Sequence, residues 1–148
     1  MKVVLQACNY GSVEINNEIV GKIENGYVCL VGFTNGDDKE IVNKMIDKII
    51  KLRVFPDENG KMNLSLIDKD YSILSISQFT LYADTFSGRR PSFTNALNPI
   101  EAKELYEYFN NQLKNNNIHI ETGQFGADML VTINNTGPCT IILDSKEF

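Results

Sequence analysis

The sequence contains few of the residues on which common hydrolytic and metal sites depend. It has one histidine, His119, and three cysteines, Cys8, Cys29 and Cys139, among 148 residues. The cysteines are odd in number, lie far apart and form no C-x-x-C pair, which argues against a disulfide framework and a zinc site. We therefore expect no metal and no cofactor, and we expect the cysteines to be small core residues or half-exposed thiols.

Several catalytic motifs are also missing. The sequence has no G-x-S-x-G elbow, no H-E-x-x-H pair and no Walker loop. His119 lies in a short strand pattern, where a histidine is more often structural or exposed than catalytic, unless a nucleophile is held beside it. A Ser-His-Asp triad, a metal hydrolase and a nucleotide-triphosphate enzyme are disfavoured. An enzyme with this sequence would depend on main-chain donors, hydroxyls or groups of the substrate.

Long hydrophobic runs and a leader pattern are missing too. No apolar stretch is long enough to span a bilayer, and residues 1–6 have the pattern of a strand rather than of a signal peptide. These features predict a cytoplasmic protein with no membrane partner. The length and the 43% hydrophobic content are those of a globular chain and predict one domain over residues 1–148.

The net charge of −5 argues against bulk attraction to nucleic acid, because domains that bind it along its length are usually basic. Recognition of one RNA end needs fewer phosphate contacts, so a local patch would suffice. Arg89 and Arg90, in a polar loop, either meet phosphates or are simply solvated. Lys44, Lys48 and Lys51 share a helix face, and a solvent-exposed stripe is the better interpretation for them.

Periodicity predicts an α+β domain. Two amphipathic helices are expected, one with Asp37 and Glu40 at capping-box spacing and one with Asn98 as N-cap and Pro99 in the first position. The mainly antiparallel or mixed sheets should curl into a barrel or sandwich with the two helices outside. Strands are expected at residues 2–7, 27–33, 71–81, 118–122, 128–134 and 139–144, with a hairpin at residues 13–20.

Two polar segments follow predicted strands. Ser77-Gln78-Phe79-Thr80-Leu81 ends one strand, and Asn135-Thr136-Gly137-Pro138-Cys139-Thr140 lies between the last two. Considered alone, the first alternates like a strand edge and the second has the composition of a turn. Gly123-Gln124-Phe125-Gly126 is too short to indicate phosphate binding, and a turn between strands is the better interpretation.

The two polar segments resemble the signature motifs of the D-aminoacyl-tRNA deacylases, S-Q-F-T-L and N-x-G-P-x-T, in the family's order and at about its spacing. The clearest departure is Ala7, where the family commonly has arginine, and it puts in doubt the polar support that the family places there. Four further segments are similar to the family over almost the whole chain: residues 57–63, 82–85, 88–93 and 123–129.

The resemblance implies an activity and a site. The family hydrolyses the ester between a D-amino acid and the 3′-terminal ribose of tRNA, and acts as a homodimer with active sites at the interface. Glycine mischarged onto tRNA(Ala) is a further expected substrate. The Gly137-Pro138 turn, with a cis peptide bond, would enter the partner's pocket. Carried onto this sequence, the catalytic residues are Ser77, Gln78, Phe79 and Thr80, and the substrate-binding residues are Phe79, Met129, Gly137 and Pro138.

Some alternatives stay open for these residues. Phe79 and Met129 either line a pocket for the terminal adenosine or pack in the core. Thr80 could be a nucleophile, but the sequence supplies no evident base for it. We favour a mechanism in which backbone N–H groups around Phe79 and Thr80 hold the oxyanion while the ribose 2′-hydroxyl orients or activates water. Gly137-Pro138 would then be a rigid wall that excludes L side chains.

Three other functions are disfavoured. In relatives that remove a wrongly attached L-amino acid such as alanine, the signature motifs differ from the one at residues 77–81. A non-catalytic nucleic-acid-binding module is disfavoured by the acidic net charge and the lack of a long basic tail. A domain that oligomerises without chemistry is disfavoured because both motifs match.

Overall fold

The computed structural model describes residues 1–86 and 88–148. A mixed sheet contains the strands β2, β1, β3, β6 and β7 in that order, and β8 also pairs with β1. A separate two-stranded sheet contains β4 and β5. The elements are β1 (Lys2–Ile15), β2 (Glu18–Ile23), β3 (Gly26–Gly32), α1 (Lys39–Lys51), β4 (Phe55–Pro56), β5 (Met62–Leu64), α2 (Leu66–Lys69), β6 (Ser72–Ser77), the 3₁₀ helix η1 (Phe79–Tyr82), α3 (Pro99–Asn115), β7 (Ile120–Thr122), β8 (Leu130–Asp144) and the 3₁₀ helix η2 (Ser145–Glu147).

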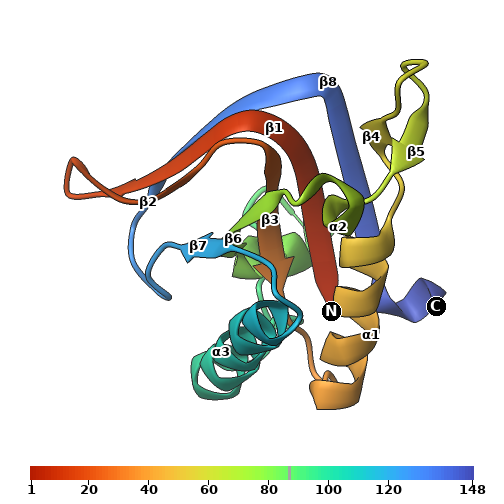
Figure 1. The fold of residues 1–148 in the computed structure, drawn as a ribbon. Coiled ribbons are helices and arrows are strands. Elements are labelled where there is room, and N and C mark those ends of the chain that lie inside the picture. The colour runs from red at the N-terminus through yellow and green to blue at the C-terminus, as the bar shows by residue number, and fades with distance from the viewer. Residues whose placement is uncertain (87) are drawn as a thin grey trace.

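The large sheet curls until it nearly closes into a barrel. Figure 1 shows β1 and β8 as a long arch, with α1 and α3 outside the sheet. β1 is antiparallel to β2, β3 and β8, whereas β3, β6 and β7 are parallel neighbours. The predicted α+β class with a curled mixed sheet and outer helices is confirmed, and the short helix α2 is an addition to the two predicted helices.

The alternation of side chains along the strands divides the core in two. On β6, Ile73 belongs to the cluster packed against the helices, and Leu74 and Ile76 belong to the cluster inside the barrel. On β3, Cys29 belongs to the cluster packed against the helices, and Val28 belongs to the cluster inside the barrel. Each such side chain contributes about 1.5–3 kcal/mol when it is fully buried. The two clusters together fix where the carboxyl ends of β3 and β6 meet.

The starts of the two long helices were predicted with different success. Pro99 follows the N-cap Asn98 of α3 as predicted, and the Asn98 side chain accepts from the Glu101 N–H. The predicted capping pair of Asp37 and Glu40 is wrong. The N-cap of α1 is Asp38, because the Asp37 carboxylate is already engaged with the Thr34 N–H and the terminal ammonium.

Several predicted strands have different limits in the structure. β1 continues through residue 15 instead of ending at residue 7, and β7 begins at Ile120 instead of residue 118. The predicted hairpin joins the end of β1 to β2, and Asn16 and Asn17 adopt positive φ values of 52° and 65° in its turn. The limits of β6 and β8 also differ, and these strands belong to the site described below. Among the described helices, none has the length and apolar character needed to cross a membrane.

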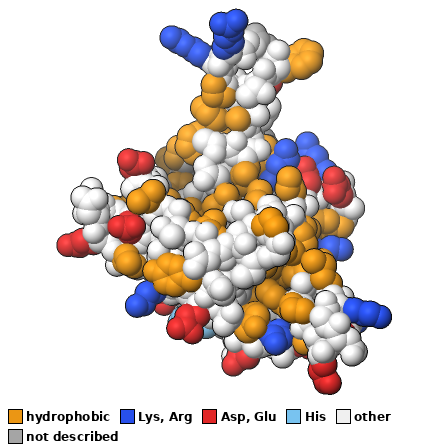
Figure 2. Space-filling model, turned by 90° about the horizontal axis from the view of Figure 1, so that it is seen from above, with side chains coloured by type: hydrophobic (Ala, Val, Ile, Leu, Met, Phe, Trp, Pro, Cys, Tyr) orange, Lys and Arg blue, Asp and Glu red, His pale blue; other side chains and the backbone are white. Residues whose placement is uncertain are grey.

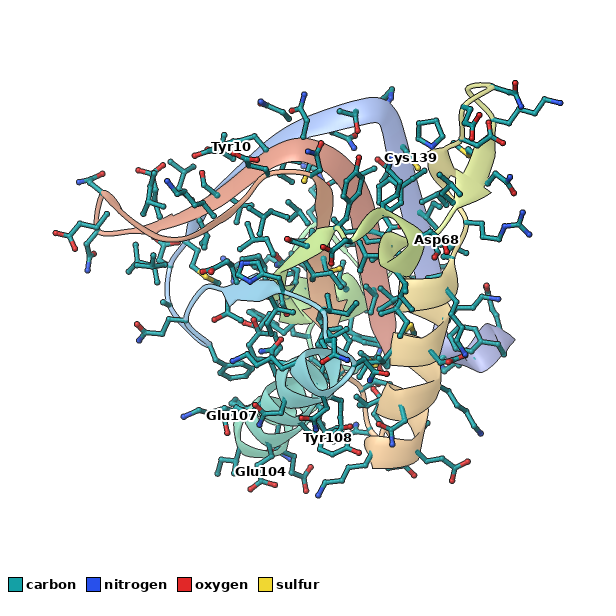
Figure 3. The ribbon with its side chains drawn as sticks, in the orientation of Figure 1. Tyr10, Asp68, Glu104, Glu107, Tyr108 and Cys139 are labelled. Carbon is teal, nitrogen blue, oxygen red and sulfur yellow. The ribbon has the colours of Figure 1, made fainter. Side chains whose placement is uncertain are left out.

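The polar and sulfur-containing side chains named in the sequence largely lie where expected. Cys8 and Cys29 are buried and Cys139 is half-buried, with all three thiols free. Figure 3 places Cys139 on β8 beside the bend of that strand. His119 is exposed, with its Nε2 atom 3.4 Å from Glu121 Oε1. Lys44 is also exposed and pairs with Glu40, in line with a solvated helix face.

Candidate active site

The first polar segment ends β6 with a turn rather than continuing the strand. The predicted strand over residues 71–81 is therefore wrong at its carboxyl end, because η1 begins at Phe79. The Gln78 N–H donates to the Val31 carbonyl at 2.7 Å, as in a continued strand. The Leu81 N–H donates to the Gln78 carbonyl at 3.4 Å, which closes the turn. The turn lies so close to β3 that a Cβ atom on Gly32 would come within 2.8 Å of that carbonyl oxygen.

This turn presents main-chain donors at the end of the sheet. The first N–H groups of a helix have no partner within the helix. Within the described part of the chain, no oxygen accepts from the N–H of Phe79 or Thr80. Phe79 is 57% exposed, and its ring packs against the edge of Phe93 at a centroid distance of 4.9 Å. Two consecutive donors of this kind suit a developing negative charge.

A cleft of about 580 Å³ opens beside the turn. Ser77, Gln78, Phe79 and Met129 line it, so four predicted site residues from distant parts of the sequence meet there. Phe79 and Met129 both line this cleft, and Met129 also packs against the core cluster inside the barrel. The volume is in the range of small-molecule sites, and most of the lining side chains are apolar.

Several lining residues were not predicted as site residues. Phe93 and Leu97 come from the segment before α3, and Phe125 and Asp128 come from the connection between β7 and β8. That connection is a turn, as predicted, and it also forms a wall of the cleft. A Cβ atom on Gly123 would collide with the Met129 sulfur, so this glycine makes room for the Met129 side chain. The available sequence signal was the family resemblance of residues 88–93 and 123–129.

Buried hydrogen bonding supports the wall formed by Phe125. The Tyr106 hydroxyl of α3 donates to the Ser75 carbonyl at 2.7 Å, and the Tyr106 ring lies 5.9 Å from the Phe125 ring. Burial raises the pKa of Tyr106, although the Ser75 hydroxyl, which donates to the Tyr106 oxygen at 3.4 Å, opposes this shift. The hydroxyl therefore stays protonated at neutral pH. Figure 3 shows Glu104 and Glu107 on α3 pointing away from the sheet, so they lie outside this arrangement.

Thr80 does not line the cleft of its own chain. Its hydroxyl accepts a hydrogen bond from the Gln78 amide. The residues that line the cleft in the described structure include one ionisable side chain, Asp128, and no histidine, lysine or cysteine. The nearby strand β1 contains a buried thiol, Cys8, but burial raises its pKa to about 11, so it is protonated at neutral pH.

The second polar segment is a bulge in one continuous strand. The sequence predicted strands at 128–134 and 139–144 with a turn between them, whereas β8 is assigned from Leu130 to Asp144. Asn135 lies opposite Cys8 of β1, and Thr140 lies opposite Gln6. Residues 136–139 therefore leave the ladder, and we call them the Gly-Pro bulge.

Side chains at both ends close the Gly-Pro bulge. The Asn135 amide donates to the Ala7 carbonyl at 2.9 Å and to the Cys139 carbonyl at 3.0 Å, and the Thr140 hydroxyl donates to Asn135 Oδ1 at 3.2 Å. This explains why the motif needs Asn and Thr at this spacing. Ala7 takes part through its main chain, so the absence of arginine there leaves this anchor intact.

The centre of the bulge requires glycine. Gly137 has a φ of 112°, and a Cβ atom on it would lie 2.5 Å from the Cys139 nitrogen. The Gly137-Pro138 peptide bond is cis, as the family resemblance implied. Both residues are exposed and lie outside the cleft of their own chain. The structure thus brings Ser77, Gln78, Phe79 and Met129 together and leaves Thr80, Gly137 and Pro138 outside.

Comparison with known sequences gives a consistent result. A family model described as D-Tyr-tRNA(Tyr) deacylase matches residues 4–144. A protein of Lactobacillus gasseri named D-aminoacyl-tRNA deacylase is 54% identical over 144 residues, which cover 97% of this chain and 99% of the relative. A Bacillus pumilus protein of the same name is 52% identical over 147 residues, which cover 99% and 100%.

Solved structures have the same fold. The c-Myc DNA Unwinding Element Binding Protein superposes with a TM-score of 0.92 at 38% identity, over 97% of this chain and 98% of that one. A probable eukaryotic D-amino acid tRNA deacylase superposes with a TM-score of 0.81 over 96% and 97% of the two chains. At 17% identity, this second likeness concerns the fold alone.

Proposed function

The chain belongs to the D-Tyr-tRNA(Tyr) deacylase family, and we propose that it hydrolyses the ester bond of D-aminoacyl-tRNA to release the D-amino acid and free tRNA. The observation that carries this proposal is the cleft at which Ser77, Gln78 and Phe79 meet Met129. Such a hydrolase removes D-amino acids from tRNA before they enter protein synthesis. In this proposal it acts as a single domain in the cytoplasm, where its substrate is found.

The oxyanion is held by the main chain in this proposal. Water attacks the ester carbonyl carbon, and the carbonyl oxygen becomes negatively charged beside the N–H groups of Phe79 and Thr80. The carbonyl then re-forms, the bond to the ribose oxygen breaks, and that oxygen leaves with a proton. The neighbouring 2′-hydroxyl orients or activates the water. Support comes from the two N–H groups without an acceptor in the described chain.

Replacing Thr80 by alanine should leave most of the activity in place. The substitution removes the hydroxyl that accepts from Gln78 but keeps the Thr80 N–H. Single-turnover hydrolysis of D-tyrosyl-tRNA by the T80A variant should remain within about tenfold of the wild type, because one neutral hydrogen bond contributes about 0.5–1.5 kcal/mol. A folded T80A variant without activity would instead make Thr80 the nucleophile.

A homodimer completes the site in this proposal. The Gly-Pro bulge of one subunit enters the cleft of the other and faces residues 77–80. The exposure of Gly137 and Pro138 outside their own cleft supports this arrangement. Leu130 and Ile142, which are 64% and 69% exposed on the same strand, provide apolar surface for the contact.

The Gly-Pro bulge provides the chiral selection in this proposal. L- and D-aminoacyl groups differ in where the side chain points from the α-carbon. A wall of main-chain atoms has little freedom to repack, so it excludes the L side chain by a steric clash. The hydrogen bonds from Asn135 and Thr140 support such rigidity. Glycine has no side chain to exclude, so glycine mischarged onto tRNA(Ala) is also hydrolysed.

Nucleic-acid binding without chemistry is a second candidate function. The name of one structural relative refers to binding of a DNA element. A gel shift with plain duplex DNA at increasing salt distinguishes the two candidates. Strong, salt-dependent retardation of the DNA together with no ester hydrolysis would favour the second candidate.

A further inference from the structure

A loop beside the cleft concentrates positive charge in an acidic protein. Residues 71–100 contain one carboxylate, Asp84, and two cations, Arg89 and Arg90, whereas the whole chain has a net charge of −5. Both arginines are exposed, and neither takes part in an ion pair within the described part of the chain. Arg90 lies three positions before the lining residue Phe93, and both guanidinium groups are available for an anionic ligand.

The base of this loop is well defined. Asp84 and Ser92 exchange two backbone hydrogen bonds of 2.8 Å, and the Asp84 carboxylate accepts from the Phe86 N–H at 2.9 Å. We call residues 84–86 and 88–92 the arginine loop. Figure 2 shows a lobe that stands out from the body, with basic side chains at its tip. The hydrogen bonds fix the root of the loop while its tip meets solvent.

The arginine loop leads directly into the cleft. Phe93 follows Ser92, lines the cleft and packs edge-on against Phe79. Phe86, within the loop, is 98% exposed. An exposed aromatic ring in the same loop as two exposed arginines matches the chemistry of single-stranded nucleic acid, in which bases stack on rings and phosphates meet cations.

We propose that the arginine loop binds the single-stranded 3′ end of the tRNA, with Phe86 stacked on an unpaired base and Arg89 and Arg90 in contact with phosphates. This inference rests on the proposed function, because it places the rest of the RNA end next to an ester held in the cleft. It also explains how an acidic protein binds RNA: two or three local contacts replace a basic surface.

The test compares a full substrate with a minimal one. D-tyrosyl-tRNA contains the whole 3′ end, whereas adenosine esterified with D-tyrosine lacks the phosphates and the preceding bases. The R89A/R90A variant should raise the KM for D-tyrosyl-tRNA at least about tenfold. It should also reduce the slope of log KM against log salt concentration by about 1.4, because each of two single-strand phosphate contacts contributes about 0.7. The F86A variant should raise the same KM about 5- to 100-fold through lost stacking.

Matched controls separate these effects from changes in charge and exposed surface. The K44A/K48A variant removes the same charge from α1, and the I100A variant removes an apolar side chain that is 75% exposed. Neither control should change the KM for D-tyrosyl-tRNA more than about twofold, since surface changes of this kind have small effects. On the minimal ester, all four variants should match the wild type.

Two results would overturn the proposal. One is an unchanged KM for D-tyrosyl-tRNA in both loop variants. The other is an equal loss on the minimal ester, which would mean that the loop shapes the cleft instead of binding RNA. Fluorescence anisotropy with an oligonucleotide that has the tRNA 3′-end sequence and no attached amino acid tests RNA binding by the loop independently of hydrolysis. Weaker binding by the loop variants would support the loop proposal even if the wild type hydrolysed neither ester, an outcome that would reject only the proposed function.

Discussion

Replacing Phe79 by proline is expected to slow hydrolysis of D-tyrosyl-tRNA about 10²–10³-fold more than replacing it by alanine, which is the cost of removing one oxyanion donor. Both substitutions remove the ring, but only proline also removes the N–H. Gln78 before it has φ −146° and ψ 84°, outside the helical region, as a residue before proline prefers. Proline is also favoured in the first helical position, so the turn should persist.

The comparison of F79P with F79A isolates the main-chain donor. Single-turnover rates at saturating enzyme report the chemical step, and circular dichroism during thermal unfolding checks that both variants are folded. Equal rates for the two folded variants would mean that the Phe79 N–H does not stabilise the transition state. The mechanism would then need another source of positive potential.

Replacing Gly137 by alanine should lower the single-turnover rate on D-tyrosyl-tRNA about 10²-fold, the cost expected when a site wall shifts by about 1 Å. Alanine is strained at a φ of 112°, and its Cβ atom would lie 2.5 Å from the Cys139 nitrogen. The bulge must therefore change shape. Because it is exposed on its own chain, the barrel should remain folded, but the ratio of D to L hydrolysis should fall.

Gly60 offers the matched control for this substitution. It has a φ of 73° in the turn between β4 and β5, and a Cβ atom there would meet nothing within 4 Å. The G60A variant therefore also places alanine at a positive φ, but away from the cleft and without a steric clash, and should keep wild-type rates and selectivity. Sedimentation of both variants reports whether the subunits still associate. If G137A were as active and as selective as G60A, the bulge would not form the chiral wall.

The central residues of most strands and helices could be predicted because the sequence patterns that indicate them are local. The apolar stripe of α1 and the N-cap of α3 depend only on residues that are a few positions apart. The hairpin at Asn16 and Asn17 likewise depends on residues that accept positive φ. The cap of α1 was misplaced by one residue because the Asp37 carboxylate has a distant partner at the chain terminus. Local spacing contains no information about such a contact.

The two signature segments were the least predictable parts, for physical reasons. The alternation of residues 71–81 is that of a strand, but the close approach of Gly32 to the Gln78 carbonyl accompanies a turn after Ser77. The composition of residues 135–140 is that of a turn between strands. The side chains of Asn135 and Thr140 instead close a bulge, so both halves of β8 remain paired with β1.

The lining of the cleft could be predicted only in part. Ser77, Gln78, Phe79 and Met129 came from the family resemblance, and the structure places all four at one cleft. Phe93 lies in a segment that resembles the family, residues 88–93, but its place beside Phe79 depends on the connection between η1 and α3 and was not predicted. Residues that meet only through tertiary contacts leave no periodic pattern in the sequence.

The most direct test of the central claim is single-turnover hydrolysis of D-tyrosyl-tRNA and L-tyrosyl-tRNA by the wild-type protein, with no metal added and a chelator present. We predict rapid loss of the D ester and no loss of the L ester above the uncatalysed rate. Loss of neither ester by a folded protein would contradict the deacylase function and favour a binding module. Loss of both would contradict the selection proposed for Gly137 and Pro138.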